Sequence, residues 1–281
     1  SFTNFATLSY NGGTTNSNIV TGEILEALTA VKTAVSANYS AGDRITYALS
    51  LVNTGTAAIT DYTVTDNLGG YTVGANTVYP LAYNAGTVRY YINGVLQTAP
   101  TVTAGPPLTV TGLTVPAGGN AVLIYETTAT PVAPLATGSS ITNTATITGG
   151  GLTNPITAQA TVETANSAEL SISKALSPTT VTENGQITYT FVISNTGNTE
   201  ATATGNVVVT DTFAPILRNI AVTYNGTAWT EGTNYTYNAA TGVFTTLAGQ
   251  ITVPAATFTQ NTDGTFTVTP GTATLVITGT V

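Results

Sequence analysis

One lysine, one aspartate and one asparagine recur in two sets, each residue on a strand face that is otherwise apolar. Side chains alternate between the two faces of a strand, so every second residue shares a face. Burying an unpaired ammonium or carboxylate costs several kcal/mol, so these side chains must meet one another if they are buried. The sets are Lys32, Asp66 and Asn143, and Lys174, Asp211 and Asn4.

Two kinds of chemistry fit such a set. One is a buried ion pair between lysine and aspartate with the asparagine hydrogen-bonded to it. The other is an amide cross-link. Desolvation lowers the pKa of the lysine and yields a neutral, nucleophilic amine. A protonated aspartic acid then polarises the asparagine carbonyl, and the amine displaces ammonia. From these residues alone, both outcomes remain open.

The elements that position these residues form an internal repeat. Residues 29–68 resemble residues 171–213, and the turn Asn53-Thr54-Gly55 matches Asn195-Thr196-Gly197. Each copy has short runs rich in Thr, Val, Ile and Tyr, with a turn about every ten residues. The pattern predicts an all-β protein made of two tandem immunoglobulin-like β-sandwiches.

The two copies end differently. The first continues into strands at 140–147 and 156–162, whereas the second has no such strands before residue 281. Residues 1–8 resemble 140–147, which places Phe2, Asn4, Ala6 and Leu8 on one strand face. We therefore predict a donor segment at 1–28, a first domain at 29–166, and a second domain at 167–281 that lacks its last strands.

A sandwich without two strands leaves an open edge, and open edges recruit other strands. If segment 1–28 completes the second domain of a neighbouring molecule, the contact is donor-strand complementation and propagates head to tail. In the alternative, the segment folds back onto its own second domain or extends the first. The way 1–28 joins the first domain resembles the join between the two domains, which favours exchange between subunits.

Short motifs carry a resemblance to known families. The Thr-Lys or Ser-Lys start, the Asn-Thr-Gly turn, Val-Thr-Asp and Thr-Asn-Thr-Ala resemble the bacterial surface conserved-repeat family, a domain of unknown function (the eleven type). The Lys–Asp–Asn order is similar to the isopeptide-forming domains of Gram-positive pilins and adhesins. This resemblance implies a Lys32–Asn143 bond assisted by Asp66. It also implies a bond from Lys174, assisted by Asp211, to Asn4 of the neighbouring subunit.

Composition narrows the function classes. The net charge is −8 with only five basic residues, so no basic patch for nucleic acid is expected. No apolar run is long enough to span a membrane. The chain has no Cys and no His, which excludes zinc sites built on them and Cys or His catalytic dyads. We expect no metal and no cofactor, and we interpret the chain as a mature extracellular protein of a bacterial surface.

Two weaker signals remain. Aromatic residues near the Asn-Gly hairpins form either a carbohydrate platform or part of the cores: Tyr90, Tyr91, Trp229, Tyr235 and Tyr237. The acids Asp43, Asp61 and Glu183 are either calcium ligands or ordinary surface residues. The sequence thus predicts a non-enzymatic, self-assembling filament subunit. The alternative is a monomeric adhesin or spacer that binds a glycan or host ligand through its loops.

Overall fold

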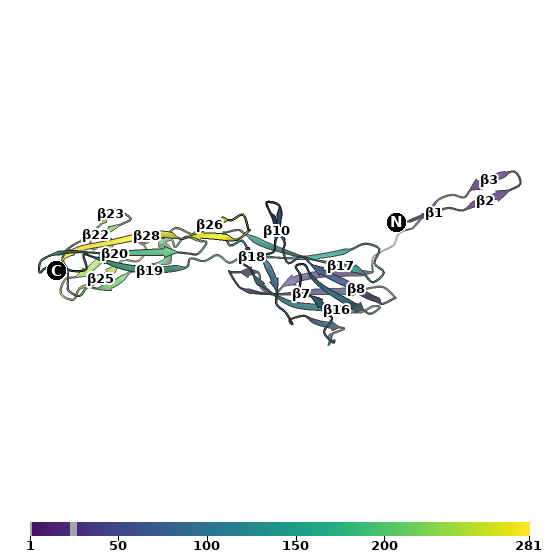
Figure 1. The fold of residues 1–281 in the computed structure, drawn as a ribbon, viewed down its shortest axis with the longest axis horizontal. Coiled ribbons are helices and arrows are strands. Elements are labelled where there is room, and N and C mark those ends of the chain that lie inside the picture. The colour runs from purple at the N-terminus through teal and green to yellow at the C-terminus, as the bar shows by residue number, and fades with distance from the viewer. Residues whose placement is uncertain (1, 23–26) are drawn as a thin grey trace.

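A computed structural model describes residues 2–22 and 27–281. Two β-sandwiches follow one another along the long axis, and a separate hairpin lies beyond the first sandwich (Figure 1). The only helix in the described residues is the short 3-10 turn η1 (Ala203–Gly205), and none of these residues forms a helix able to cross a membrane. The predicted all-β class with tandem sandwiches is confirmed.

The first domain consists of two packed sheets and one small hairpin. One sheet has the order β13-β12-β16-β7-β5, with β11 also paired to β16, and the other has the order β14-β15-β8-β17-β18-β6. The first sheet comprises β5 (Leu28–Ala34), β7 (Arg44–Asn53), β11 (Leu81–Tyr83), β12 (Arg89–Ile92), β13 (Val95–Leu96) and β16 (Asn120–Ala129). The second comprises β6 (Asn38–Tyr39), β8 (Ile59–Asp66), β14 (Thr101–Thr103), β15 (Leu108–Val115), β17 (Ser140–Gly149) and β18 (Ile156–Thr164). The hairpin is β9 (Tyr71–Val73) with β10 (Asn76–Val78).

Alternation along the central strands builds the core between these sheets. In β7 every second residue, from Ile45 to Leu51, is buried, and β16 repeats this pattern from Ala121 to Ala129. Each fully buried large apolar side chain contributes roughly 1.5–3 kcal/mol relative to an exposed one. The same period of two carries Lys32, Asp66 and Asn143 into this core, because each occupies an inward position of its strand.

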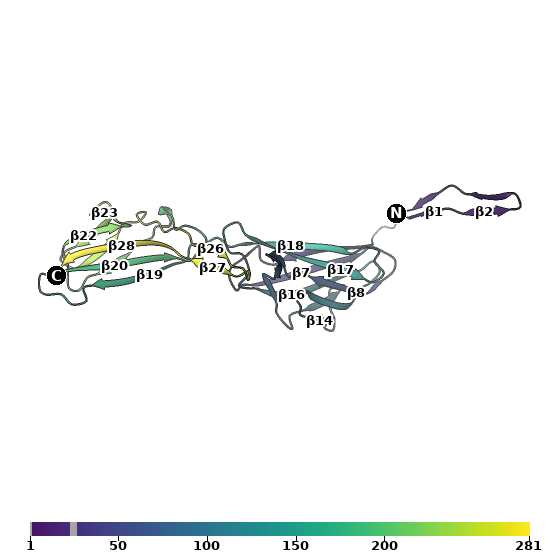
Figure 2. The same cartoon turned by 45° about the horizontal axis from the view of Figure 1, so that its top comes forward.

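The second domain repeats the first sheet but only part of the second. The order β19-β20-β28-β22-β23 matches β5-β7-β16-β12-β13, whereas the facing sheet has only β21-β25-β24. Its strands are β19 (Leu170–Ser177), β20 (Gln186–Asn195), β21 (Thr210–Thr212), β22 (Arg218–Tyr224), β23 (Thr227–Trp229), β24 (Tyr235–Asn238), β25 (Val243–Thr246) and β28 (Gly271–Thr280). A further hairpin, β26 (Thr257–Gln260) with β27 (Phe266–Thr269), reaches the first domain (Figure 2). Within the described residues, nothing in this domain corresponds to β17 and β18, as predicted.

The N-terminal segment forms a long hairpin of its own. In this hairpin β1 (Phe2–Asn4) pairs with β4 (Val20–Gly22), and β2 (Thr7–Tyr10) pairs with β3 (Gly13–Asn16). It lies at the end of the first domain that faces away from the second domain, rather than against its own second domain (Figures 1 and 2). Residues 1 and 23–26 of the predicted donor segment lie outside the described residues.

Candidate functional site

The first candidate site is a cluster enclosed between the two sheets of the first domain. Lys32 on β5 places its Nζ 2.6 Å from Oδ2 of Asp66 at the end of β8, and their side chains are 0% and 1% exposed. The backbone N–H of Leu68 donates to Oδ1 of Asp66 at 2.9 Å, and the hydroxyl of Tyr125 donates to Oδ2. The carboxylate is therefore fully bonded without water, which offsets the cost of burying it.

Two tyrosine rings form the walls around the ammonium. The Nζ of Lys32 lies 4.8 Å from the ring centroid of Tyr47 and 5.8 Å from that of Tyr125. Such contacts are attractive for a desolvated cation. Burial nevertheless lowers the pKa of Lys32 from 10.5 to about 8, while the charge of Asp66 and its hydrogen bond act in the opposite direction. A substantial neutral fraction of this amine is therefore present at mildly alkaline pH.

Asn143 is the unusual member of the cluster. Its strand β17 pairs with β8 so that Ala145 lies opposite Asp66, which puts Asn143 two residues away on the same face. The side chain is fully buried, yet neither its amide oxygen nor its amide nitrogen makes a hydrogen bond. It lies close to the hydroxyls of Tyr47 and Tyr125, whose pKa values are raised mainly by burial and lowered slightly by this neighbour.

An unpaired buried amide is costly. Each unsatisfied group of this kind costs about 1–3 kcal/mol, so such groups are rare in folded proteins. In this cluster the amide lies beside a lysine whose charge burial disfavours and an acid able to carry protons. Nucleophilic attack of the Lys32 amine on the carbonyl carbon of Asn143 is the chemistry that this arrangement supports.

The second candidate site has the same pair in an open setting. The Nζ of Lys174 lies 2.5 Å from Oδ2 of Asp211, but the two side chains are 41% and 18% exposed. Every residue of β19 is exposed, including the apolar Ile172 and Leu176. The expected burial of this lysine is therefore not found in the single chain. In the first domain β18 lies over β5, and no described strand does so for β19.

Asn4 is not brought to Lys174 within one chain. It lies on β1 of the exposed N-terminal hairpin with Phe2, and Ala6 and Leu8 follow along the same segment. The hairpin repeats the register of the strands it resembles. Asn4 pairs with Val20 as Asn143 pairs with Ala160, and Phe2 pairs with Gly22 as Ile141 pairs with Val162.

One residue of the first cluster escaped sequence reasoning. Tyr47 on β7 lies opposite Tyr125 on β16, whereas the matching Tyr189 on β20 lies opposite Ile277 on β28. The second site therefore has no hydroxyl at this position, and the aromatic groups around its lysine are Tyr189, Phe191 and Phe213. Aligning the late strands of the two copies places a tyrosine against an isoleucine, but only the fold shows that this tyrosine reaches Asp66.

The weaker sequence signals have structural explanations in part. Tyr90 and Tyr235 are buried in the cores, and the hydroxyl of Tyr237 donates to the carbonyl of Leu217. Trp229 stacks on Tyr224 with 4.8 Å between ring centroids. Asp43 accepts the backbone N–H of Ser40 in a turn. Asp61 and Glu183 join no acidic cluster, since no group of three metal-binding side chains occurs in the part of the chain that the structure describes.

Comparisons with known proteins give similarities to solved structures alone. No protein-family description and no curated protein sequence matches the chain, so membership of the conserved-repeat family stays a prediction. The major pilin subunit of Bacillus cereus is 14% identical, with 96% of this chain and 73% of that chain covered and a TM-score of 0.36.

Two further structures are similar at the same level. The pilus backbone protein of Streptococcus pneumoniae is 14% identical, covers 86% of this chain and 55% of its own, and has a TM-score of 0.36. The N-terminal domain of an adhesin from Streptococcus gordonii is 14% identical, covers 47% of this chain and 31% of its own, and has a TM-score of 0.35. Scores below 0.5 carry no argument about what this chain does.

Proposed function

We propose that this protein is the structural subunit of an extracellular filament on a bacterial surface. In this assembly the N-terminal hairpin of one copy completes the second sandwich of the next, and the contact propagates head to tail. The carrying observation is the match in register: the hairpin pairs around Asn4 as β17 and β18 pair around Asn143. Its function is mechanical and requires no catalysis on a substrate.

The edge that would accept the hairpin lies beside the open lysine site. In the first domain β8 pairs with β15 on one side and β17 on the other. The corresponding β21 pairs only with β25 among the described strands. An open edge beside an exposed apolar face favours addition of strands that bury both.

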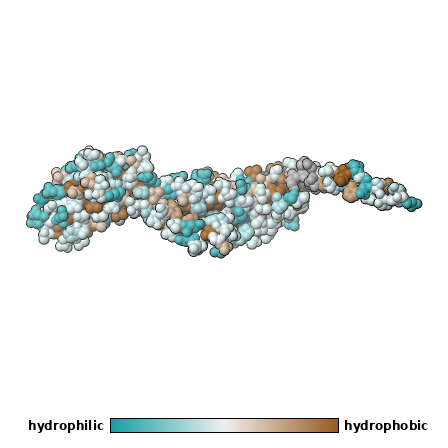
Figure 3. Space-filling model, turned by 90° about the horizontal axis from the view of Figure 1, so that it is seen from above, coloured by the Kyte–Doolittle hydropathy of each residue, from teal (hydrophilic) through white to brown (hydrophobic). Residues whose placement is uncertain are grey.

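The hairpin and the second domain each expose apolar side chains that such a contact would cover. Phe2, Leu8 and Val20 on the hairpin are 53%, 63% and 54% exposed, and apolar surface is visible there in Figure 3. Ile172 and Leu176 of β19 are 55% and 38% exposed. Burying apolar surface contributes roughly 25 cal/mol per Å², which supplies the driving force for assembly.

Assembly would bring Asn4 to Lys174 and permit a covalent link. Lys174 first passes its proton to Asp211, and the neutral amine attacks the side-chain carbonyl carbon of Asn4. The Nζ–Cγ bond forms, the Cγ–Nδ2 bond breaks, and the nitrogen leaves as ammonia with the proton returned by Asp211. The same steps within the first domain would join Lys32 to Asn143.

Deletion of residues 2–22 tests the assembly directly. The full chain should form regular fibres in electron micrographs and a ladder on a gel after boiling in denaturant. The deleted chain should remain a monomer in both assays. Fibres from the deleted chain, or a full chain that stays monomeric at high concentration, would contradict donor-strand assembly.

Single substitutions then separate assembly from cross-linking. With Asn4→Ala we expect fibres that dissociate into monomers on boiling, because the strands still fit but no amide forms. Asn18→Ala, at an exposed asparagine of the same hairpin, is the matched control and should keep the ladder. A ladder that survives Asn4→Ala would show that the link uses another residue.

A further inference from the structure

The hairpin β26–β27 is an insertion that distinguishes the two domains. In the first domain the turn Ala117-Gly118 joins β15 to the start of β16. At the equivalent place in the second domain, residues 255–270 intervene. The equivalence follows from the pairing: Ala201 bridges Val253 as Ile59 pairs with Val115.

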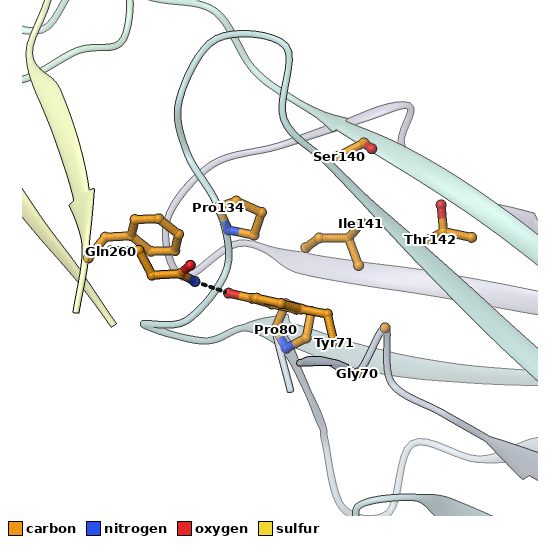
Figure 4. A pocket seen from close by; sticks show the side chains of 10 residues that line it. Gly70, Tyr71, Pro80, Pro134, Ser140, Ile141, Thr142 and Gln260 are labelled. Carbon is orange, nitrogen blue, oxygen red and sulfur yellow. Dashed lines mark hydrogen bonds between the residues drawn. The ribbon is translucent and has the colours of Figure 1, made fainter. Parts of the chain in front are cut away.

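This inserted hairpin makes contact with the first domain. The amide Nε2 of Gln260 donates to the hydroxyl of Tyr71 at 2.9 Å, as Figure 4 shows. At the hairpin tip, Gly264 approaches Val78 so closely that a Cβ atom there would lie 2.8 Å from the valine side chain. Gly264 also has φ +88, so the tip needs glycine both for its backbone and for this contact.

The hairpin also closes two cavities at the boundary between the domains. Phe266 and Gln260 line a cavity of about 440 Å³ together with Pro134 and Ile141 of the first domain (Figure 4). Phe258 borders a second cavity of about 220 Å³ with Leu135. Aromatic side chains from the insertion therefore extend the contact beyond one hydrogen bond.

Asn198 forms a second connection at the same boundary. Its Nδ2 donates to the carbonyls of Leu135 and Ala165, at 2.9 Å each. Its own carbonyl accepts the hydroxyl of Thr137 at 2.6 Å. In the first domain the matching position, directly after Asn53-Thr54-Gly55, is Thr56, which has no amide with which to make these bonds.

We propose that β26–β27 and Asn198 act as a clamp that holds the two domains of one chain in a fixed orientation. Contacts between domains are mobile by default unless the interface is extensive, so a dedicated clamp changes the mechanics of the chain. The end of the first domain that would meet a neighbouring copy has neither element. Given the proposed filament, bending is confined to the junction between copies, and each chain behaves as one stiff segment.

The chain enters both domains in the same way, which makes the two junctions comparable. The N–H of Thr54 donates to the carbonyl of Ala27, and the N–H of Thr196 donates to that of Glu169, at 2.8 and 2.9 Å. The difference between the junctions therefore lies in the clamp and not in the path of the chain.

Spin labels measure the clamp without reference to polymerisation. The chain has no Cys, so Val95→Cys and Thr236→Cys place one label on an exposed strand site in each domain. The distance distribution should be narrow in the full chain. Replacing residues 255–270 with Ala-Gly together with Asn198→Thr should broaden it about twofold. A distribution that stays as narrow as in the parent would overturn the clamp.

Milder variants guard against misfolding of the shortened chain. Gln260→Ala combined with Asn198→Thr should broaden the distribution with unchanged thermal stability of each domain, whereas Thr259→Ala on the same hairpin should have no effect. Equal effects of both would overturn the assignment.

Electron micrographs of fibres test the junction between copies. Angles between successive domains should alternate between a narrow and a broad distribution. Uniform angles would overturn the hinge, and the absence of fibres would instead refute the proposed function while leaving the label result intact.

Discussion

Replacing Asn143 with alanine separates the two accounts of the first cluster, because they predict opposite effects. If Lys32 and Asp66 form only an ion pair, the substitution removes a buried amide that makes no hydrogen bond. Relief of that amide, about 1–3 kcal/mol, roughly offsets the packing lost with the side chain. The expected change in the free energy of unfolding is then within about 1 kcal/mol.

If an amide joins Lys32 to Asn143, the same substitution opens a covalent loop. A cross-link across about 110 residues restricts the unfolded chain by about 5 kcal/mol in the loop-entropy treatment used for disulfides. For a domain of this size, that loss corresponds to a fall in melting temperature of roughly 10–20 °C.

The assay combines thermal unfolding with intact mass. In the deletion of residues 2–22, which removes polymerisation, a Lys32–Asn143 bond lowers the mass by about 17 Da through loss of ammonia. Asn143→Ala should show its full calculated mass and the lower melting temperature. Thr142→Ala, at an exposed neighbour on the same strand, should keep both the mass loss and the stability. A parent chain of full mass and an Asn143→Ala chain of equal stability would refute the bond.

Three further predictions concern the first domain. In Asn143→Ala chains Lys32 has a pKa of about 8 instead of 10.5, so the unfolded state binds more protons in this interval. Stability in urea should therefore rise by about 2–3 kcal/mol from pH 8 to pH 10, until ionisation of unfolded tyrosines opposes it, and a flat profile would contradict the pKa. In the same background Tyr125→Phe should cost roughly 1.5–3 kcal/mol in urea unfolding, because the carboxylate loses a buried donor; an unchanged midpoint would contradict this role. Gly69→Ala should destabilise the domain more than Gly86→Ala in thermal unfolding. Both have positive φ, but only a Cβ on the former would clash with a core isoleucine, at 2.6 Å; equal losses would argue against that contact.

Much of the fold was predictable because its signals are local. A period of two assigns each strand residue to a face, so the inward positions of Lys32 and Asp66 follow from their own strands. The repeat then predicts a second copy of the sandwich, and the difference between its two ends predicts the missing strands. None of these inferences requires knowledge of which distant strands pair.

The rest depends on contacts between segments far apart in the chain. The hydroxyl of Tyr125 reaches Asp66 only because β16 and β8 face each other across the core. The exposure of Lys174 depends on which strands cover β19, and a sequence pattern assigns faces without saying what lies above them.

The sequence by itself determined the strand pattern, the tandem repeat and the polar residues carried on apolar faces, since all three are properties of neighbouring residues or of self-similarity. The tertiary structure alone decided which of those faces are enclosed, that the amide of Asn143 has no hydrogen-bond partner, and that β26–β27 meets the first domain. The physical reason is that enclosure and contact depend on long-range packing, which no local period encodes.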